Sequence, residues 1–510
     1  MWTMTLPSSD KGPPFVTRRS WIIVWTLSLV AGLALWPIIG WKIAVSQTIL
    51  GVPLWLACLS CAVKLRDRLG ALWVVLLAPL LRQLLWVNLP AVGFSAFTAD
   101  PRFEKLVTTV GLKDVSGAAL LLTLSNYTLF AVLVALLCVF KLRLDISQCR
   151  ASRAIGVFGL GLTAIWTVYR FYDQYYAMVL RGTERFGGSI TYSWGYVGFT
   201  LLLCMMMPSP PALPNKLTTV KWFFAAAIFG GLMLGIGQRM FVLYPMMICM
   251  CLGLAVYSDR LRLRHLLITG TAGAAVVPVV FAMMLGVRRT YYFSGSLPNL
   301  MELPSLVAYG FGDMGYAVQE AGVRVSMLLF LTQTVVSAGS GLPTYGWQQV
   351  LFTFLDSLCS PRIFSFSALF GVSTEVQGLT PGAWLARLFG DPDSTMTFNP
   401  EAAFYLAGGP VGVVIGAVIV AVVACFWIFV AVRLQKNKAI GLAIAVGAVF
   451  TNLVLAELFN TVVSVFTWYM IVLIVLLKAG DLSFRAARRL AKAHPGLRKL
   501  PRAGVDLGNA

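Results

Sequence analysis

Long apolar stretches recur along the chain and constrain its fold more than any other feature. Most run for roughly 17 to 25 residues, the length of a helix that crosses the hydrocarbon core of a bilayer. The chain is 58% hydrophobic and only 12% charged. The sequence therefore predicts an all-α, polytopic membrane protein.

We expect about twelve transmembrane helices. They are predicted at residues 21–40, 43–63, 70–97, 117–140, 154–169, 190–207, 221–237, 240–257, 266–287, 401–432, 439–457 and 460–478. The first apolar stretch is too long for a typical signal-peptide core and lacks a convincing small-residue cleavage site, so we expect it to be retained. Both termini then lie on the same side of the membrane.

Basic residues concentrate on one side of this predicted topology. With a cytoplasmic N-terminus, the inner segments hold 26 of the 40 Lys and Arg residues but only 6 of the 20 Asp and Glu residues. The net charge of +20 is therefore a topology signal, as the positive-inside rule requires, and does not indicate nucleic-acid binding. We expect the basic tail, residues 479–510, to rest near anionic lipid headgroups.

The longest segment without a spanning stretch lies between the ninth and tenth predicted spans. This segment is a large predicted outer loop (288–400). The chain then consists of helices 1–9 (1–287), this loop, helices 10–12 (401–478) and the cytoplasmic tail. Residues 325–336 are apolar but too short to span, which predicts an interfacial or re-entrant helix. Further short apolar pieces occur at 350–358 and 363–372. We expect a folded cap that offers acidic residues for catalysis.

One arginine is predicted inside the membrane. Arg82 lies beside Gln83 near the middle of the third span. A central arginine costs roughly 2.5 to 3.5 kcal/mol on insertion scales, so its side chain should face the bundle or a wet cavity. It forms either a structural pair with an inward-facing acid or a contact with a ligand, and both readings stay open.

Other arginines lie at the outer ends of predicted spans. Arg239 ends a tight Gly235-Ile-Gly-Gln turn, and Arg288-Arg289 close the ninth span. Guanidinium groups match phosphate oxygens bidentately, so these positions predict an anion site. Snorkelling or interfacial anchoring is the alternative.

A mixture of aromatic and polar residues follows the fifth span, from Tyr169 onward, in a predicted outer loop. Such a mixture forms either an interfacial belt or a sugar-binding surface, because pyranose rings stack on aromatic faces while hydroxyls bond to polar planar groups. The candidate glycan contacts are Arg170, Tyr172, Asp173, Tyr175 and Arg181.

An outer reaction would have to use a carboxylate as its base. Both histidines, His265 and His494, are predicted on the cytoplasmic side. No acidic or histidine pair has convincing metal-ligand spacing, with Asp391-x-Asp393 a weak cation candidate, so no metal or cofactor is expected. The chain also lacks a phosphate-cradling loop and a G-x-S-x-G motif, which argues against nucleotide hydrolysis and serine-hydrolase chemistry.

The order of several motifs resembles one enzyme family. Gly235-x-Gly-Gln-Arg239 opens an apolar helix, Arg288-Arg289 close the next, and after the long loop a motif from Phe398-Asn-Pro-Glu401 to Gly412 enters a span. This layout, over residues 220–478, resembles the O-antigen and oligosaccharide repeat-unit polymerases of the Wzy type. The absence of an outer histidine favours these polymerases over the related ligases.

The resemblance implies a glycosyltransferase of the bacterial inner membrane that polymerises undecaprenyl-diphosphate-linked oligosaccharides on the outer face. Arg239, Arg288 and Arg289 would bind the departing diphosphate, with Arg82 and the outer-loop arginines in reserve. Glu401 would be the base for the acceptor hydroxyl, with Asp313 and Glu302 behind it. Tyr291 would join the glycan contacts. Implied partners are the lipid-linked oligosaccharide, the bilayer and, as a candidate, a chain-length regulator.

Two other classes remain alternatives. Twelve spans with both ends inside is also the major-facilitator layout, and Asp67-Arg68-Leu-Gly70 echoes that family's loop motif, although Val63 stands where its upstream glycine is expected. A transporter or lipid-linked glycan flippase is therefore the main rival. A polyprenyl-phosphate-dependent glycosyltransferase is the second, but the first outer loop, residues 40–42, lacks the acidic pair typical of those enzymes.

Overall fold

A computed structural model of the chain describes ten longer segments and several short pieces. The short pieces include 197–199, 201–203, 279–280, 282–283 and 285–286. The first predicted span, and all but single positions of the last two, lie outside the described residues, so the count of twelve stays a prediction. The longer segments are 51–88, 112–144, 153–175, 216–234, 240–256, 301–313, 327–339, 345–359, 365–376 and 400–433, and the pair 387–388 is a further short piece.

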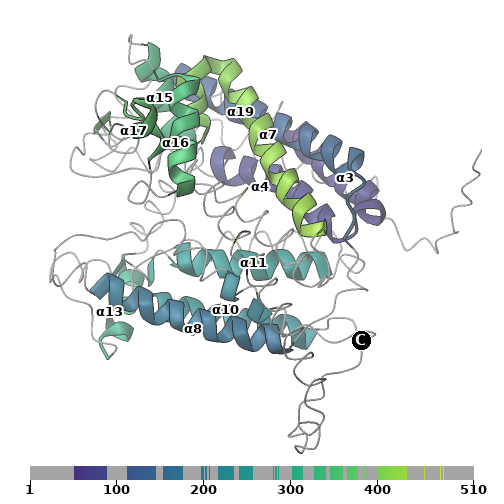
Figure 1. The fold of residues 1–510 in the computed structure, drawn as a ribbon, viewed down its shortest axis with the longest axis vertical. Helices are drawn as coiled ribbons and strands as arrows, with labels where there is room; N and C mark the ends of the chain where they lie inside the picture. The colour runs from purple at the N-terminus through teal and green to yellow at the C-terminus, as the bar shows by residue number, and fades with distance from the viewer. Residues whose placement is uncertain are drawn as a thin grey trace, which may run out of the picture.

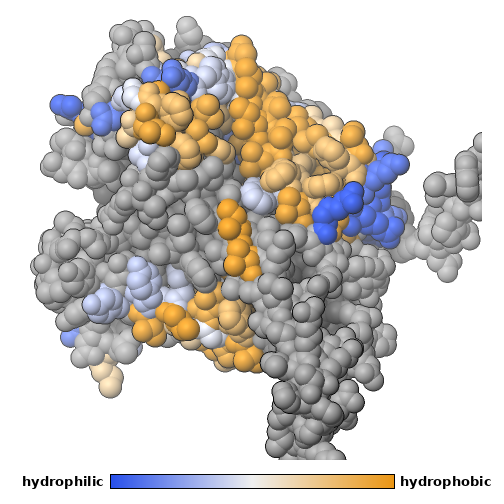
Figure 2. Space-filling model, viewed as in Figure 1, coloured by the Kyte–Doolittle hydropathy of each residue, from blue (hydrophilic) through white to orange (hydrophobic). Residues whose placement is uncertain are grey.

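Helices dominate these segments, and two are long and apolar enough to cross a membrane. They are Val115–Val139, within α7 (Leu112–Val139), and α19 (Pro400–Arg433), with mean hydropathies of 2.1 and 3.1. Val411, Ile415, Val422 and Phe426 form an exposed apolar stripe on α19. Figure 2 shows this hydrophobic surface along the helix. A stripe of this kind suits contact with lipid tails, as expected of a membrane protein.

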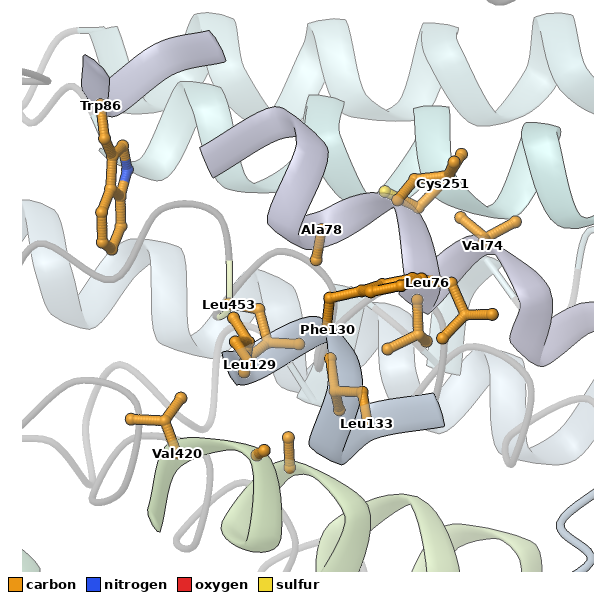
Figure 3. Packing of buried hydrophobic residues seen from close by; sticks show 14 of the residues in the cluster. Val74, Leu76, Ala78, Trp86, Leu129, Phe130, Leu133, Cys251, Val420 and Leu453 are labelled. Carbon is orange, nitrogen blue, oxygen red and sulfur yellow. The ribbon is translucent and has the colours of Figure 1, made fainter. Parts of the chain in front are cut away.

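The packed core lies around α7. Figure 3 shows Leu129, Phe130 and Leu133 of this helix between Val420 of α19 and Leu76 of the 3₁₀ helix η2 (Ala71–Leu77). All five side chains are buried. Before η2 comes α3 (Val52–Leu69), and after it the short α4 (Ala78–Arg82). Apolar packing therefore fixes the position of the third predicted span, which carries Arg82.

A second group of helices lies beside this core. Figure 1 shows α8 (Arg153–Tyr175), α10 (Lys216–Leu234) and α11 (Met240–Val256) running roughly alongside one another. Trp166 of α8 stacks on Phe229 of α10, with 5.8 Å between ring centroids. The outer loop expected from Tyr169 onward is wrong at its start, because α8 continues as a helix to Tyr175.

Exposed charges gather where α3 and α7 end. Arg68 donates a hydrogen bond of 3.0 Å to the carbonyl of Cys138, and the Leu144 backbone bonds with both Leu69 and Ala71. Gly70, between Leu69 and Ala71, has φ +58°, and a Cβ at this position would fall 2.1 Å from Leu144 O. Figure 2 shows the hydrophilic patch over this end of α3. Packing contacts thus account for Arg68 and Gly70 of the transporter-like motif.

The large predicted loop contains four described helices, α13 (Leu303–Gly312), α15 (Met327–Gly339), α16 (Trp347–Cys359) and α17 (Phe366–Phe370). The helix predicted at 325–336 is confirmed as α15, which is buried against α7 and α19. The apolar pieces 350–358 and 363–372 lie on α16 and α17. Helix α13 was not predicted from the sequence, and its backbone approaches residues 282–286 closely at Gly310 and Gly286.

A buried aspartate joins two of these loop helices. Asp356 of α16 accepts hydrogen bonds from the Ser367 N–H at 3.0 Å, from the Ser365 hydroxyl at 3.2 Å and from the Ser367 hydroxyl. The Ser365 hydroxyl in turn caps α17 by accepting from the Ala368 N–H. Asp356, one of the loop acids, is therefore committed to holding the loop together.

Candidate functional site

The most unusual contact in the structure is an ion pair inside the helix bundle. Arg82 Nη2 donates a charge-assisted hydrogen bond to Glu401 Oε1. Both residues are 2% exposed. Of the two readings left open for Arg82, a pair with an inward-facing acid is the one found. The acid, Glu401, is also the residue for which the family resemblance implies the role of base.

Arg82 is presented by an irregular stretch of helix. Successive 3₁₀, α and π segments run from Ala71 to Asn88, with Pro79 at the start of α4 and Arg82 at its end. π-Helical turns are rare and are frequent at functional sites. The π segment η3 (Gln83–Asn88) places Trp86 beneath the guanidinium, which lies 3.9 Å from the ring centroid. This cation–π contact helps to stabilise a charge removed from water.

Glu401 reaches the bundle because α19 is broken near its start. Gly408 and Gly409 have non-helical torsions, with φ +59° at Gly409, and Pro410 follows. This corrects the continuous span expected over 401–432. Glycine tolerates the positive φ, and proline cannot continue the hydrogen bonding of the preceding turn. The uninterrupted part, residues 410–433, is still about 36 Å long, enough to cross a bilayer.

The break folds residues 400–407 back against the longer helix. A Cβ on Gly412 would fall 2.1 Å from the Phe404 carbonyl oxygen, and one on Gly416 would fall 1.9 Å from the Phe404 ring. In a continuous helix, residues eight positions apart would be separated by about 12 Å. Trp347 of α16 covers the break, with 5.9 Å between its ring centroid and that of Phe404. The sequence predicts Glu401 at the entry to the tenth span, and this fold-back places its side chain inside the bundle.

Ser125 of α7 completes the contacts of Glu401. Its hydroxyl donates a hydrogen bond of 3.3 Å to Glu401 Oε1, the oxygen that Arg82 also bonds. Ser125 lies 14 positions before the end of α7 at Val139, a helical rise of about 21 Å. The pair therefore lies at the level of the middle of a membrane-length helix, well away from the end that carries the exposed charges.

Beside the ion pair lies a ladder of neutral side chains. Asn126 Nδ2 donates to Gln83 Oε1 at 2.9 Å, and Gln83 Nε2 donates to Thr123 Oγ1 at 3.0 Å. The Thr123 hydroxyl donates to the Ala119 carbonyl at 2.8 Å. All of these side chains are buried. We call Arg82, Gln83, Thr123, Ser125, Asn126 and Glu401 the polar cluster.

Several polar atoms here have no hydrogen-bond partner among the described residues. Glu401 Oε2, Arg82 Nε and Asn126 Oδ1 are buried and unpaired, as is Gln333 Oε1 on α15. Buried polar groups are normally paired, and leaving one unpaired costs about 1 to 3 kcal/mol. Such atoms require a further partner, which an ordered water or a bound molecule can supply. In chemical terms, Oε2 is a carboxylate oxygen available to take a proton.

The other sequence-predicted candidates are not part of the polar cluster. Glu302 and Asp313 flank α13, the first exposed and the second half-buried, whereas the hydrogen bonds of Glu401 run to Arg82 and Ser125. Tyr172 is exposed on α8. The side chains of Arg170, Asp173 and Tyr175, and the whole of Arg181, Arg239, Arg288, Arg289 and Tyr291, lie outside the described residues.

Sequence reasoning missed three members of the cluster. Thr123, Ser125 and Asn126 stand together in the otherwise apolar fourth span, and that local polarity was a usable signal. Their clustering with Arg82 was not visible, because it depends on how two helices face each other. Within the described segments, no three His, Cys, Asp or Glu residues come together as metal ligands.

Comparison with known proteins gives no relative. No family model matches the chain, and no curated protein or solved structure matches it.

Proposed function

We propose that the protein is a membrane glycosyltransferase that polymerises undecaprenyl-diphosphate-linked oligosaccharide repeats into a surface polysaccharide at the outer face of the bacterial inner membrane. One observation carries the proposal. A carboxylate to which the family resemblance gives the role of base is held by arginine and serine inside an apolar bundle, and its second oxygen has no partner among the described residues. Ionisable residues within spans usually mark functional sites.

In this reaction Glu401 is the general base. Its Oε2 takes the proton of the acceptor hydroxyl. As that proton leaves, the oxygen of the acceptor hydroxyl bonds to the anomeric carbon of the donor glycan. The bond from that carbon to the diphosphate oxygen breaks, and undecaprenyl diphosphate leaves with the electron pair. Arg82 and Ser125 fix the carboxylate by holding Oε1, so that Oε2 is presented to the acceptor.

The departing diphosphate needs cations of its own. Arg82 is engaged by Glu401 and Trp86, so in the proposal it positions the base and does not bind phosphate. Arg239, Arg288 and Arg289 keep the phosphate-binding role that the sequence suggests. The packing of α15, part of the large loop, against α7, η3 and α19 supports an enzyme whose loop helps to build the site.

A specific observation also favours the alternative, a transporter or lipid-linked glycan flippase. Broken helices with polar groups near the membrane midplane are typical of transporter sites. Both helices that carry the ion pair are interrupted, one by 3₁₀ and π segments and the other at Gly408-Gly409.

Deletion of the gene in its native host separates these functions. We would analyse surface and lipid-linked glycans by gel electrophoresis and mass spectrometry. Single repeats on the outer face, with long chains missing, are the expected result. Single repeats trapped on the cytoplasmic face would establish a flippase, and an unchanged glycan profile would leave the transporter.

Complementation then tests the site. Glu401→Gln should restore no polymer even where the protein is still detected in the membrane. Glu375→Gln is the matched control, because Glu375 is an exposed loop acid and should restore full polymer. Full polymer from Glu401→Gln would remove Glu401 as the base.

A further inference from the structure

The direction of the hydrogen-bond ladder decides which kind of group the polar cluster lacks. The Thr123 hydroxyl has one hydrogen, and it donates that hydrogen to the Ala119 carbonyl. Its oxygen can then only accept from Gln83, so the Gln83 amide must turn its nitrogen toward Thr123. The side chains at one end of the ladder thereby fix the orientation of the next.

The same logic fixes Asn126. Because Gln83 turns its side-chain oxygen toward Asn126, Asn126 must donate to it from its amide nitrogen Nδ2. Its oxygen Oδ1 is left over, buried and without a partner in the described parts of the chain. Reversing Asn126 would set two carbonyl oxygens against each other, so the unpaired group is an acceptor by construction.

The ion pair leaves an acceptor as well. Arg82 and Ser125 both donate to Glu401 Oε1, and Glu401 Oε2 remains unpaired. Ser125 and Asn126 are consecutive on α7, and Arg82 and Gln83 are consecutive on the facing segment, so both unpaired acceptors lie where α7 faces this segment. Arg82 Nε is a buried donor atom that has no partner among the described residues.

We propose that the polar cluster binds a hydroxyl-bearing, uncharged sugar through Asn126 Oδ1 and Glu401 Oε2, and that it does not bind phosphate. A hydroxyl supplies the hydrogen that each acceptor lacks, and its oxygen can accept from Arg82 Nε. An ionised phosphate offers oxygens only, and it would meet a carboxylate and an amide oxygen in a buried site. The identification of the sugar as the acceptor substrate rests on the proposed function, but the binding chemistry does not.

Two amphiphiles with the same alkyl chain separate the ligand classes. We would measure thermal unfolding of the full-length protein in lipid nanodiscs with n-dodecyl β-glucoside or with dodecyl phosphate. The glucoside should raise the Tm of the wild type in a saturable manner. Asn126→Leu should lose this rise, whereas any shift with dodecyl phosphate should be equal in the two proteins.

Two further variants guard the result against simple loss of folding. Thr123→Val keeps the amides of Gln83 and Asn126 but removes the hydroxyl that fixes the orientation of the Gln83 amide. The Gln83 amide can then take either orientation, so the glucoside-induced rise in Tm should fall only in part. Thr128→Val is the matched control, because Thr128 makes the same kind of bond to the Leu124 carbonyl, at 2.9 Å, on an exposed part of α7. It should keep the full shift.

Three results would overturn the proposal. They are a glucoside shift that survives Asn126→Leu, a phosphate shift that Asn126→Leu abolishes, and no saturable glucoside shift in the wild type, which would assign the unpaired acceptors to water. A glucoside site in a protein whose deletion leaves polymerisation intact would refute the proposed function alone.

Discussion

Arg82 and Glu401, 319 positions apart in the chain, form an ion pair in which each side chain is 3% exposed. The pair joins α4 to the folded-back start of α19, and Ser125 ties it to α7. Three segments that are remote in sequence therefore depend on one contact. Its charges, its geometry and the glycines that permit it can each be tested separately.

Removing one charge of the pair should destabilise the protein strongly. Arg82→Met and Glu401→Leu should each lower the free energy of unfolding by about 3 to 5 kcal/mol, because each leaves a buried charge without a partner. The double variant should be close to the wild type, since apolar side chains replace both charges. Thermal and denaturant unfolding in detergent would measure this cycle. Additive losses in the double variant would contradict a direct pairing.

Because the chain folds back at Gly408-Gly409, Phe404 lies against both Gly412 and Gly416. Removing the Phe404 ring should therefore affect alanine variants at these two glycines differently. Gly416→Ala brings its methyl group against the Phe404 ring, whereas Gly412→Ala brings it against the Phe404 carbonyl. Both variants should lose stability. Adding Phe404→Ala should improve Gly416→Ala, because the ring is gone, but should leave Gly412→Ala impaired. Equal rescue of both, measured by Tm, would show that residues 400–407 do not lie against this face.

Gly70 should tolerate no side chain. Gly70→Ala would hold a non-glycine residue at φ +58° and place its Cβ 2.1 Å from Leu144 O, costing at least about 1 to 3 kcal/mol. Gly117→Ala on α7 is the control, because its Cβ would meet nothing within 4 Å and alanine favours a helix by about 0.5 to 1 kcal/mol. Opposite shifts in Tm are expected. A neutral Gly70→Ala would refute the close approach.

Asp356 should matter for the loop and hardly at all for the bundle. Asp356→Ala removes the acceptor of the buried Ser367 N–H, so we expect a loss of about 1 to 3 kcal/mol confined to α16 and α17. Hydrogen exchange followed by mass spectrometry should show faster exchange there. Glu375→Ala, at an exposed position, should leave exchange unchanged. Uniform acceleration across α7 and α19 would mean that the loop is not a separate unit.

Local sequence signals predicted the helices well and their interruptions poorly. The spans expected at 117–140 and 401–432 differ from α7 and α19 by a few residues at their ends, because apolar length dominates there. The residues that break α19, Gly408-Gly409-Pro410, are visible in the sequence. A hydropathy average taken over the length of a span is hardly changed by three residues, so it does not reveal the break. The same averaging hid the irregular course from Ala71 to Asn88.

The site could be predicted only in part. A charge in a span must face inward, which correctly required a partner or ligand for Arg82. Nothing local selects Glu401 from the other acids, because the choice depends on the reversal at Gly408-Gly409. The ladder through Gln83 and Asn126 likewise depends on the facing of two helices, a property of packing that a single sequence does not display.

The long separation between Arg82 and Glu401 has a consequence for biosynthesis. At about 5 to 20 residues per second, a ribosome needs roughly 16 to 64 s to advance the 319 positions from Arg82 to Glu401. The third predicted span therefore enters the membrane long before its counter-charge exists. For that time Arg82 must be sheltered by water, by lipid headgroups or by the insertion machinery. Completion of the bundle is thus timed by the synthesis of its tenth predicted span.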